Sequence, residues 1–355
     1  MRRIFVNPAG QRDNLGDSIL RRPYLDALRD RGELHVLAGK DRDYSSGLGI
    51  RDGDVVYESR AKWFAGALAS GLVGKLIFAS NAGEVVGTDA EKRRARWQPL
   101  IASLARRTGG DVIVAGVSVR PGTDASATQL PRLVRSATVV TWRDEAARQA
   151  LRIGSVQPDW AFALGGTESF ADRSRLAIAL RGDRPPLSDR MVSVLRTYAE
   201  QHGLSLWVVV QVRRDAAAAR ELRSRLGAEI FDWSADTDHA HHERALREFY
   251  RTCRVIASDR IHALIIAATE GATPIGLATS DPAKLARTFD HVYPLPIIDA
   301  RSETATLSDL PVDDPTLSSH LAAARQALEC VRASIADPEG RQPQDTGIQP
   351  VRASQ

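Results

Sequence analysis

The sequence has little cysteine and no long uninterrupted hydrophobic run. Its 355 residues include two cysteines, Cys253 and Cys330, which lie far apart and outside any CxxC spacing. This pattern argues against a disulfide framework or a zinc site, and it is typical of proteins of the reducing cytoplasm. The longest apolar stretch, residues 64–80, is interrupted by three glycines and by Lys75. It is therefore too short and too broken to span a bilayer.

Other familiar signals are also missing. Neither GxGxxG nor GxxxxGK[ST] occurs, so neither a dinucleotide cofactor nor P-loop chemistry is indicated. The first residues, MRRIFVNPAG, pass directly into a predicted strand without the apolar region of a signal peptide, so we expect a cytoplasmic protein. The net charge is +4, and Lys and Arg are spread along the chain. This favours anionic small molecules or a membrane surface, rather than nucleic acid, as partners.

Short β-branched runs alternate with longer amphipathic segments, which predicts βαβ units and mostly parallel sheets. The predicted strands are 3–7, 34–38, 55–58, 76–79, 111–117, 138–142, 156–158, 176–180, 206–210, 230–233, 255–257 and 273–278. The predicted helices include 89–107, 145–153, 188–202, 216–226, 243–253 and 315–334, and one that follows Asp17 with a short first turn ahead of Pro23.

The periodicity lapses around residues 165–168, which makes this segment the best linker. We therefore expect two Rossmann-like α/β domains facing each other across a cleft, at residues 1–165 and 170–310. A C-terminal helix would follow at 311–335. The last segment, 336–355, is rich in Pro, Gln, Asp and Gly and is expected to be disordered.

The most informative motif is Ser258-Asp259-Arg260-Ile261-His262, which joins an apolar strand to an apolar helix. Ligands bind open α/β sheets at the carboxyl ends of strands, and a helix N-terminus offers free N–H groups to an anion. Arg260 adds a planar donor fork, and His262 adds a group that titrates near neutral pH. The motif therefore indicates an enzyme that handles an anion.

Further polar residues follow other predicted strands. Asn14, Gly16 and Asp17 come after the first strand, where Asp17 could cap a helix or act on a sugar hydroxyl. Arg143 and Arg181 each follow an apolar run, and either could equally pair with a nearby carboxylate.

Two clusters favour simpler interpretations. The run His239-Ala240-His241-His242 tempts a metal assignment, but we expect exposed histidines in a polar loop and no metal. The basic run at residues 92–96 is expected to be a solvated helix face.

Together these elements resemble the polysaccharide pyruvyl transferase family over residues 4–300. The matching elements are Asn14-x-Gly16-Asp17, Arg143-Asp144-Glu145, Pro158-Asp159, Ser258-x-Arg260-x-His262-Ala263 and Lys284. The most specific is Ser-x-Arg-x-His-Ala, followed by Gly271-x-x-Pro274-Ile275.

The resemblance implies a GT-B-like fold and transfer of a pyruvyl group from phosphoenolpyruvate to two hydroxyls of a sugar, forming a ketal without a metal or redox cofactor. Arg260 and Lys284 of the second domain would bind the donor. Arg143 of the first domain would be a further donor ligand, and Arg181 of the second domain a weaker one. His262 would be the general acid and Asp17 a catalytic residue that positions or deprotonates the hydroxyl. Asn14 and Gly16 would bind the acceptor on the side of the first domain.

Two other functions remain open. A glycosyltransferase of the same architecture would use a nucleotide-sugar, whose ribose would want an acidic partner, and Glu270 is poorly placed for that at the far end of its helix. A non-catalytic glycan- or anion-binding protein is the third. The acceptor could be carried on a membrane lipid, with the basic residues near Arg93 facing the inner membrane surface. The sequence leaves the acceptor sugar, the ketal stereochemistry and the oligomeric state undetermined.

Overall fold

The computed structural model describes residues 2–165 and 173–338 and divides into two compact units. Of the described residues, unit 1 contains 2–11, 17–160 and 326–338, and unit 2 contains 12–16, 161–165 and 173–325. Residues 166–168 of the expected linker lie outside the described residues. So do residues 339–355 of the segment that was expected to be disordered.

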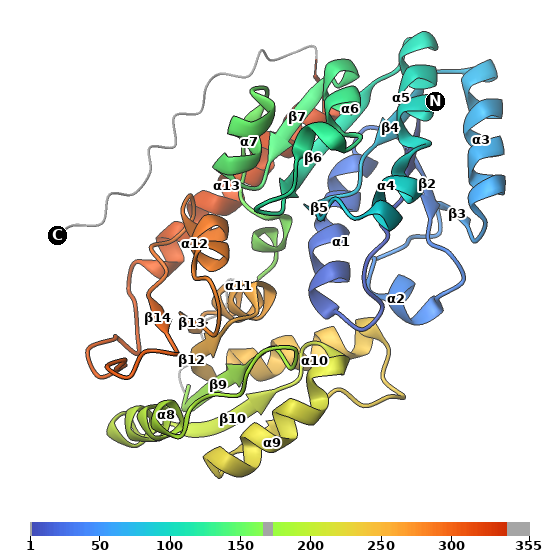
Figure 1. Cartoon of the computed structure of the whole chain (residues 1–355). Helices are drawn as coiled ribbons and strands as arrows, with labels where there is room; N and C mark the ends of the chain where they lie inside the picture. Colours follow the sequence, from blue (N-terminus) through green and yellow to red (C-terminus); the bar gives the residue numbers. More distant parts are fainter. Residues whose placement is uncertain (1, 166–172, 339–355) are drawn as a thin grey trace. The chain divides into compact units, whose positions relative to one another are not determined.

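Unit 1 alternates strands and helices along the chain (Figure 1). Its strands are β1 (Arg3–Val6), β2 (Glu33–Leu37), β3 (Val55–Tyr57), β4 (Leu76–Ala79), β5 (Gly83–Val85), β6 (Val112–Val119), β7 (Val139–Trp142) and β8 (Ser155–Val156). Its helices are α1 (Leu15–Arg29), α2 (Arg42–Ser46), α3 (Arg60–Val73), α4 (Asp89–Ala95), α5 (Gln98–Arg107), α6 (Leu130–Ser136) and α7 (Glu145–Leu151), with a 3-10 turn at Ala125–Ala127. Helix α1 has its first two residues in unit 2.

The sheet of unit 1 is parallel, with the order β3-β2-β1-β4-β6-β7-β8 and with β5 beside β6. Strand β6 is buried along its whole length, as expected when a parallel sheet is covered on both faces. On one face, Trp63 of α3 packs edge-on against Trp97, with 5.0 Å between the ring centroids. Trp97 also meets Phe78 of β4 edge-on. These aromatic side chains form the centre of the core that holds α3 and α5 on the sheet.

Unit 2 repeats this architecture (Figure 1). Its strands are β9 (Arg175–Ala179), β10 (Ser205–Val209), β11 (Glu229–Phe231), β12 (Cys253–Ser258), β13 (Thr273–Ala278) and β14 (Ile297–Asp299). Its helices are α8 (Asp189–Gln201), α9 (Ala216–Leu226), α10 (His239–Arg251), α11 (Ile261–Thr269) and α12 (Ala283–Phe289), with a 3-10 turn at Arg213–Asp215. Another 3-10 turn, Trp160–Ala163, begins with the last residue of this part of unit 1 and continues into unit 2. Helix α13 (Leu317–Ala336) begins in unit 2, and its second half belongs to unit 1.

The six described strands of unit 2 run parallel in the order β11-β10-β9-β12-β13-β14. This is the Rossmann order, in which the first strand is central and the chain builds outward on one side and then on the other. Helix α11 packs on the sheet, and all of its residues except His262 are buried. Its uniformly apolar sequence matches this burial, because a helix that is hydrophobic on every face is stable only inside a core.

Two predicted helices differ from the structure. The helix expected at 89–107 is broken into α4 and α5, because Pro99 lies in the first turn of α5 and cannot continue the hydrogen-bond ladder of α4. The short first turn expected ahead of Pro23 is wrong, since α1 is continuous through Pro23. Leu20, Tyr24 and Leu25 on either side of the proline are buried, and their packing maintains the helix despite the lost N–H.

The loop expected for residues 239–242 is also wrong. Asp238 caps α10 by accepting from the backbone N–H of His241, so the histidines form the first turn of that helix. His239 and His242 are buried rather than exposed, and the ring of His242 stacks on Trp233 with 4.4 Å between the centroids. The basic run at 92–96 does form a largely exposed helix face, as predicted.

Burial lowers the pKa of His242 to about 4, although the contact of its Nε2 with the carbonyl of Val210 works in the opposite direction. The unfolded chain takes up this proton near pH 6.5. Between these pH values the unfolded state binds more protons than the folded state. His242 therefore lowers the free energy of unfolding by about 3 kcal/mol as the pH falls from about 6.5 to about 4. Urea unfolding across this range measures the loss.

The variant His242→Gln retains a side-chain N–H but does not titrate. It should show a smaller decrease in unfolding free energy over the same pH range than the unmodified protein. Equal pH slopes for the two proteins would contradict the assignment of this pKa to His242.

Candidate functional site

The site lies at the carboxyl edge of the unit 2 sheet, where β9 separates β10 from β12. The strand order reverses here, and such a switch point is where open α/β sheets bind ligands. Arg181 follows β9, and Asp259 and Arg260 follow β12. The fold therefore brings two of the sequence-predicted cationic residues, Arg181 and Arg260, to one edge of the sheet.

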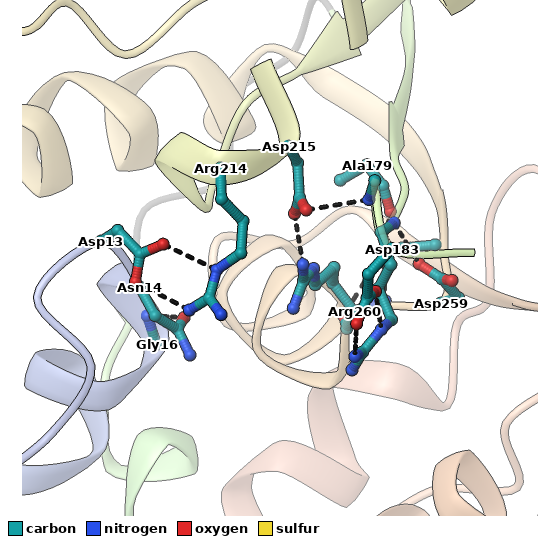
Figure 2. A network of polar contacts seen from close by, with 12 residues as sticks. Asp13, Asn14, Gly16, Ala179, Asp183, Arg214, Asp215, Asp259 and Arg260 are labelled. Carbon is teal, nitrogen blue, oxygen red and sulfur yellow. Dashed lines mark hydrogen bonds and ion pairs between the residues drawn. The ribbon is translucent and has the colours of Figure 1, made fainter. Parts of the chain in front are cut away.

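Arg260 is fixed by its backbone and by its side chain. It is the N-cap residue of α11, and its backbone N–H donates to the hydroxyl of Ser258 at 2.9 Å. That hydroxyl donates in turn to the carbonyl of Ala179 at the end of β9. The Nη2 of Arg260 donates to Oδ2 of Asp215 at 2.5 Å, and Oδ1 of Asp215 accepts from the N–H of Gly182 at 2.8 Å. Asp215 thus holds the loop after β9 and the side chain that follows β12 (Figure 2).

Asp259 connects three neighbouring strand ends. Its Oδ1 accepts from the backbone N–H of Arg181 at 2.9 Å, and its Oδ2 accepts from the hydroxyl of Thr279 at 2.6 Å. Burial raises the pKa of Asp259, although these hydrogen bonds and the nearby arginines work in the opposite direction. Neither Asp215 nor Asp259 was predicted as a site residue. Asp259 directly follows β12, and Asp215 ends the short turn after β10.

The two arginines differ in how much of their donor capacity is used. Arg181 donates from Nε and Nη2 to both oxygens of Asp183, at 2.9 and 2.6 Å. This pairing raises the pKa of Arg181 and lowers that of Asp183 to about 2. Burial lowers the pKa of Arg260, whose Nε is buried and has no partner among the described residues. Arg260 therefore presents a buried donor that an anionic oxygen can satisfy.

His262 is the second residue of α11, and it is half-buried. A Cβ atom added to Gly16 would lie only 2.2 Å from its Nδ1, so no other residue fits at position 16 without moving the imidazole ring. The N–H of Gly16 donates to Oδ1 of Asn14 at 3.1 Å, which turns the chain at this contact. The structure thus brings together His262 and Gly16, which come from distant parts of the sequence.

Residues 12–16, which comprise the end of the loop after β1 and the first two residues of α1, are part of unit 2. Asn14 forms an antiparallel bridge with Val212, and the carbonyl of Asp13 accepts from the N–H of Arg213 at 2.8 Å. The carboxylate of Asp13 pairs with Arg214 at 2.6 Å (Figure 2).

The same segment is also held from α10. His239 Nε2 donates to the carbonyl of Arg12 at 2.7 Å, so one of the buried histidines anchors it. Arg214 and His239 were not predicted to be near Asn14, since no local pattern announces such long-range pairs.

The remaining predicted residues lie elsewhere. Arg143 follows β7 in unit 1 and forms a buried ion pair with Asp159 at 3.0 Å, which is the pairing that the sequence left open. Asp17, also in unit 1, accepts from the N–H of Gln11 at 2.6 Å. Lys284 lies in the first turn of α12, after β13, and is half-buried. Their assigned roles stay predictions.

The described parts of the chain were compared with the requirements of a metal site and of a membrane-spanning helix. There, no group of three or more His, Cys, Asp or Glu side chains is arranged to hold a metal ion. In the same residues, no helix combines the length and the hydropathy needed to cross a membrane.

Comparisons with known proteins give a sequence family and a fold type. The sequence profile of the polysaccharide pyruvyl transferase family matches residues 14–281. No curated protein matches the chain significantly.

The fold is similar to that of MnaA from S. aureus with UDP, with a TM-score of 0.58 and 12% identity over 98% of this chain and 100% of that one. It is also similar to HepE from Anabaena in complex with UDP and glucose, with a TM-score of 0.55 and 13% identity over 95% and 98% of the two chains. These similarities identify a mixed α/β fold of the GT-B type, as predicted.

The two aspartate–arginine pairs at this edge should differ in their contribution to stability. The variant Asp215→Asn weakens a buried pair and should lower the free energy of unfolding by about 3 kcal/mol, because Arg260 keeps its buried charge. The matched variant Asp183→Asn removes an exposed partner of Arg181 and should cost less than about 1 kcal/mol. Denaturant unfolding at neutral pH measures both, and equal losses would show that Asp215 is not the structural anchor of this edge.

Proposed function

The chain belongs to the polysaccharide pyruvyl transferase family, and we propose that it transfers a pyruvyl group from phosphoenolpyruvate to two hydroxyls of a sugar in a polysaccharide or glycolipid precursor. The product is a pyruvate ketal. The observation that carries this proposal is the position of Arg260 and His262 at the switch point of the unit 2 sheet, on the first residues of α11.

Phosphoenolpyruvate carries a phosphate and a carboxylate, and the edge offers donors of matching kind. The unpartnered Nε of Arg260 and the N-terminal N–H groups of α11 are suited to one of its anionic groups. Lys284 on the first turn of α12 is the second donor ligand in this proposal. Arg181 is a weaker one, because two of its nitrogens already bind Asp183.

The proposed chemistry needs one proton donor and one base. His262 gives a proton to the methylene carbon, and the first sugar hydroxyl attacks the resulting cationic carbon while its own proton passes to a base. The second hydroxyl then displaces phosphate, which accepts the second hydroxyl proton. The ketal and inorganic phosphate are the products. Asp17 is the proposed base or positioning residue for the hydroxyl, and Asn14 stays the proposed acceptor ligand.

Arg143 is the least supported of the proposed donor ligands. Its guanidinium is buried and paired with Asp159, which accounts for its presence at the end of β7 without a ligand. The Nε of this arginine has no partner among the described residues, so it retains one donor that a ligand could use.

A nucleotide-sugar glycosyltransferase is the second candidate, because the solved structures of similar fold contain UDP. Its ribose would need an acidic partner near the helix N-terminus. Glu270 instead caps the far end of α11 and binds Arg247 and Arg251, so it does not favour this function. A non-catalytic glycan- or anion-binding protein is the third candidate.

Ligand-induced stabilisation separates the three functions. Phosphoenolpyruvate at about a hundred times its Kd should add about 2.7 kcal/mol of stability, whereas UDP-glucose and UDP-N-acetylglucosamine should add none. Phosphate release from phosphoenolpyruvate should then depend on a sugar, tested with a panel of p-nitrophenyl hexosides. Stabilisation by a UDP-sugar alone would contradict pyruvyl transfer, and stabilisation by none would favour the non-catalytic protein.

The acid role of His262 can be tested separately. His262→Ala should leave the affinity for phosphoenolpyruvate largely unchanged and should lower kcat by about 10²–10⁴-fold, the usual contribution of a general acid. Gly16→Ala should also lower kcat, because its methyl group displaces the His262 ring. The control Gly53→Ala adds a methyl group in open space and should change nothing. Unchanged turnover in His262→Ala would exclude this residue as the acid.

A further inference from the structure

Helix α3 of unit 1 is apolar around its circumference, yet one of its faces is not covered. After Lys62 its sequence contains no charged residue up to its end at Val73. Trp63 and Ala67 are buried against the core, whereas Leu72 is 88% exposed and Val73 is 73% exposed. Helix α11, which is more apolar, is buried, and burial is the ordinary state of a helix that is apolar on every face. We therefore expect a binding partner to cover the exposed face of α3.

The neighbouring helix α5 extends this apolar surface. Arg60, the first residue of α3, lies 6.0 Å from the ring of Trp97, just ahead of α5, and Gly71 near the end of α3 approaches Leu104. The two helices therefore lie side by side. Of the six large hydrophobic side chains exposed in the described parts of the chain, four lie on these helices, and we call them the α3–α5 patch: Leu68, Leu72, Val73 and Leu100.

The segment that carries the patch is positively charged. Residues 60–107 contain nine Lys and Arg residues and three acidic ones, a net charge of +6, whereas the whole chain has +4. Exposed cations flank both ends of α3, with Arg60 and Lys62 at its start and Lys75 directly after it. Exposed Arg107 ends α5, and the basic residues of α4 precede that helix.

We propose that the α3–α5 patch docks unit 1 on an anionic bilayer surface. Leucine and valine side chains on a helix lying in the interface enter the boundary of the acyl chains, while Lys and Arg meet the lipid phosphates. A second copy of the chain is a poorer occupant, because a symmetric dimer would bring two patches of the same positive charge together. The charge therefore selects the lipid surface.

Vesicle co-sedimentation of the full chain tests the proposal. Vesicles with about 30 mol % phosphatidylglycerol should bind it at least about tenfold more tightly than phosphatidylcholine alone, and about 0.5 M NaCl should reverse most of the difference. The double variant Leu72→Ser/Val73→Ser should lower binding to the anionic vesicles by about tenfold or more. The control Ile153→Ser alters an exposed apolar side chain elsewhere in unit 1 and should bind as the unmodified protein does.

Both variants change exposed side chains, so their thermal unfolding should match that of the unmodified protein, and phosphoenolpyruvate should affect all three proteins alike. Equal binding to both vesicle types, or undiminished binding by the double variant, would overturn the proposal. So would a dimer in light scattering that the double variant abolishes, since that would identify a second copy as the occupant.

Discussion

Asp215 accepts hydrogen bonds from the side chain of Arg260 and from the backbone of Gly182, and the arrangement of the candidate site depends on this buried carboxylate. It lies in the turn after β10, while its two partners follow β12 and β9. Three adjacent strand ends are thus joined at one side chain. Asp259 extends the network to Thr279 after β13, so four neighbouring strands have their carboxyl ends linked through two aspartates.

Such a network fixes the positions of its side chains more than it adds to the net stability of the fold. Burying charged groups removes them from water, and this cost offsets the attraction between them. The cost is visible in the shifted pKa values, since burial lowers the pKa of Arg260 and raises that of Asp259. Arg260 is held by one terminal nitrogen, and its Nε stays unpartnered among the described residues. A fixed donor of this kind needs no reorganisation when an anion arrives, which is the property expected of an electrostatic binding site.

Local patterns in the sequence predicted the features that are set by residues close together in the chain, such as the bounds of a helix. The range of α9 was predicted to the residue, and Arg260 and His262 were correctly assigned to the junction of β12 and α11, because buried parallel strands and helix starts have strong local signals. The pairing of Asp13 with Arg214 was not predictable, since it joins residues about 200 positions apart. The burial of His239 and His242 was missed because Trp233, on which they pack, lies outside the helix pattern. The cap at Asp238 was a local signal that could have identified the start of α10.

The assignment of residues 12–16 to unit 2 has a consequence for the order in which the chain acquires its native contacts. This segment emerges during synthesis well before β10 and α10, to which it binds, so it must wait for about two hundred further residues before Arg214 and His239 are present. Until then Gly16 has no imidazole beside it. The second unit is therefore not a continuous stretch of sequence, and a fragment that begins at residue 161 would lack Asn14, the bridge partner of Val212, and Asp13, the carboxylate partner of Arg214.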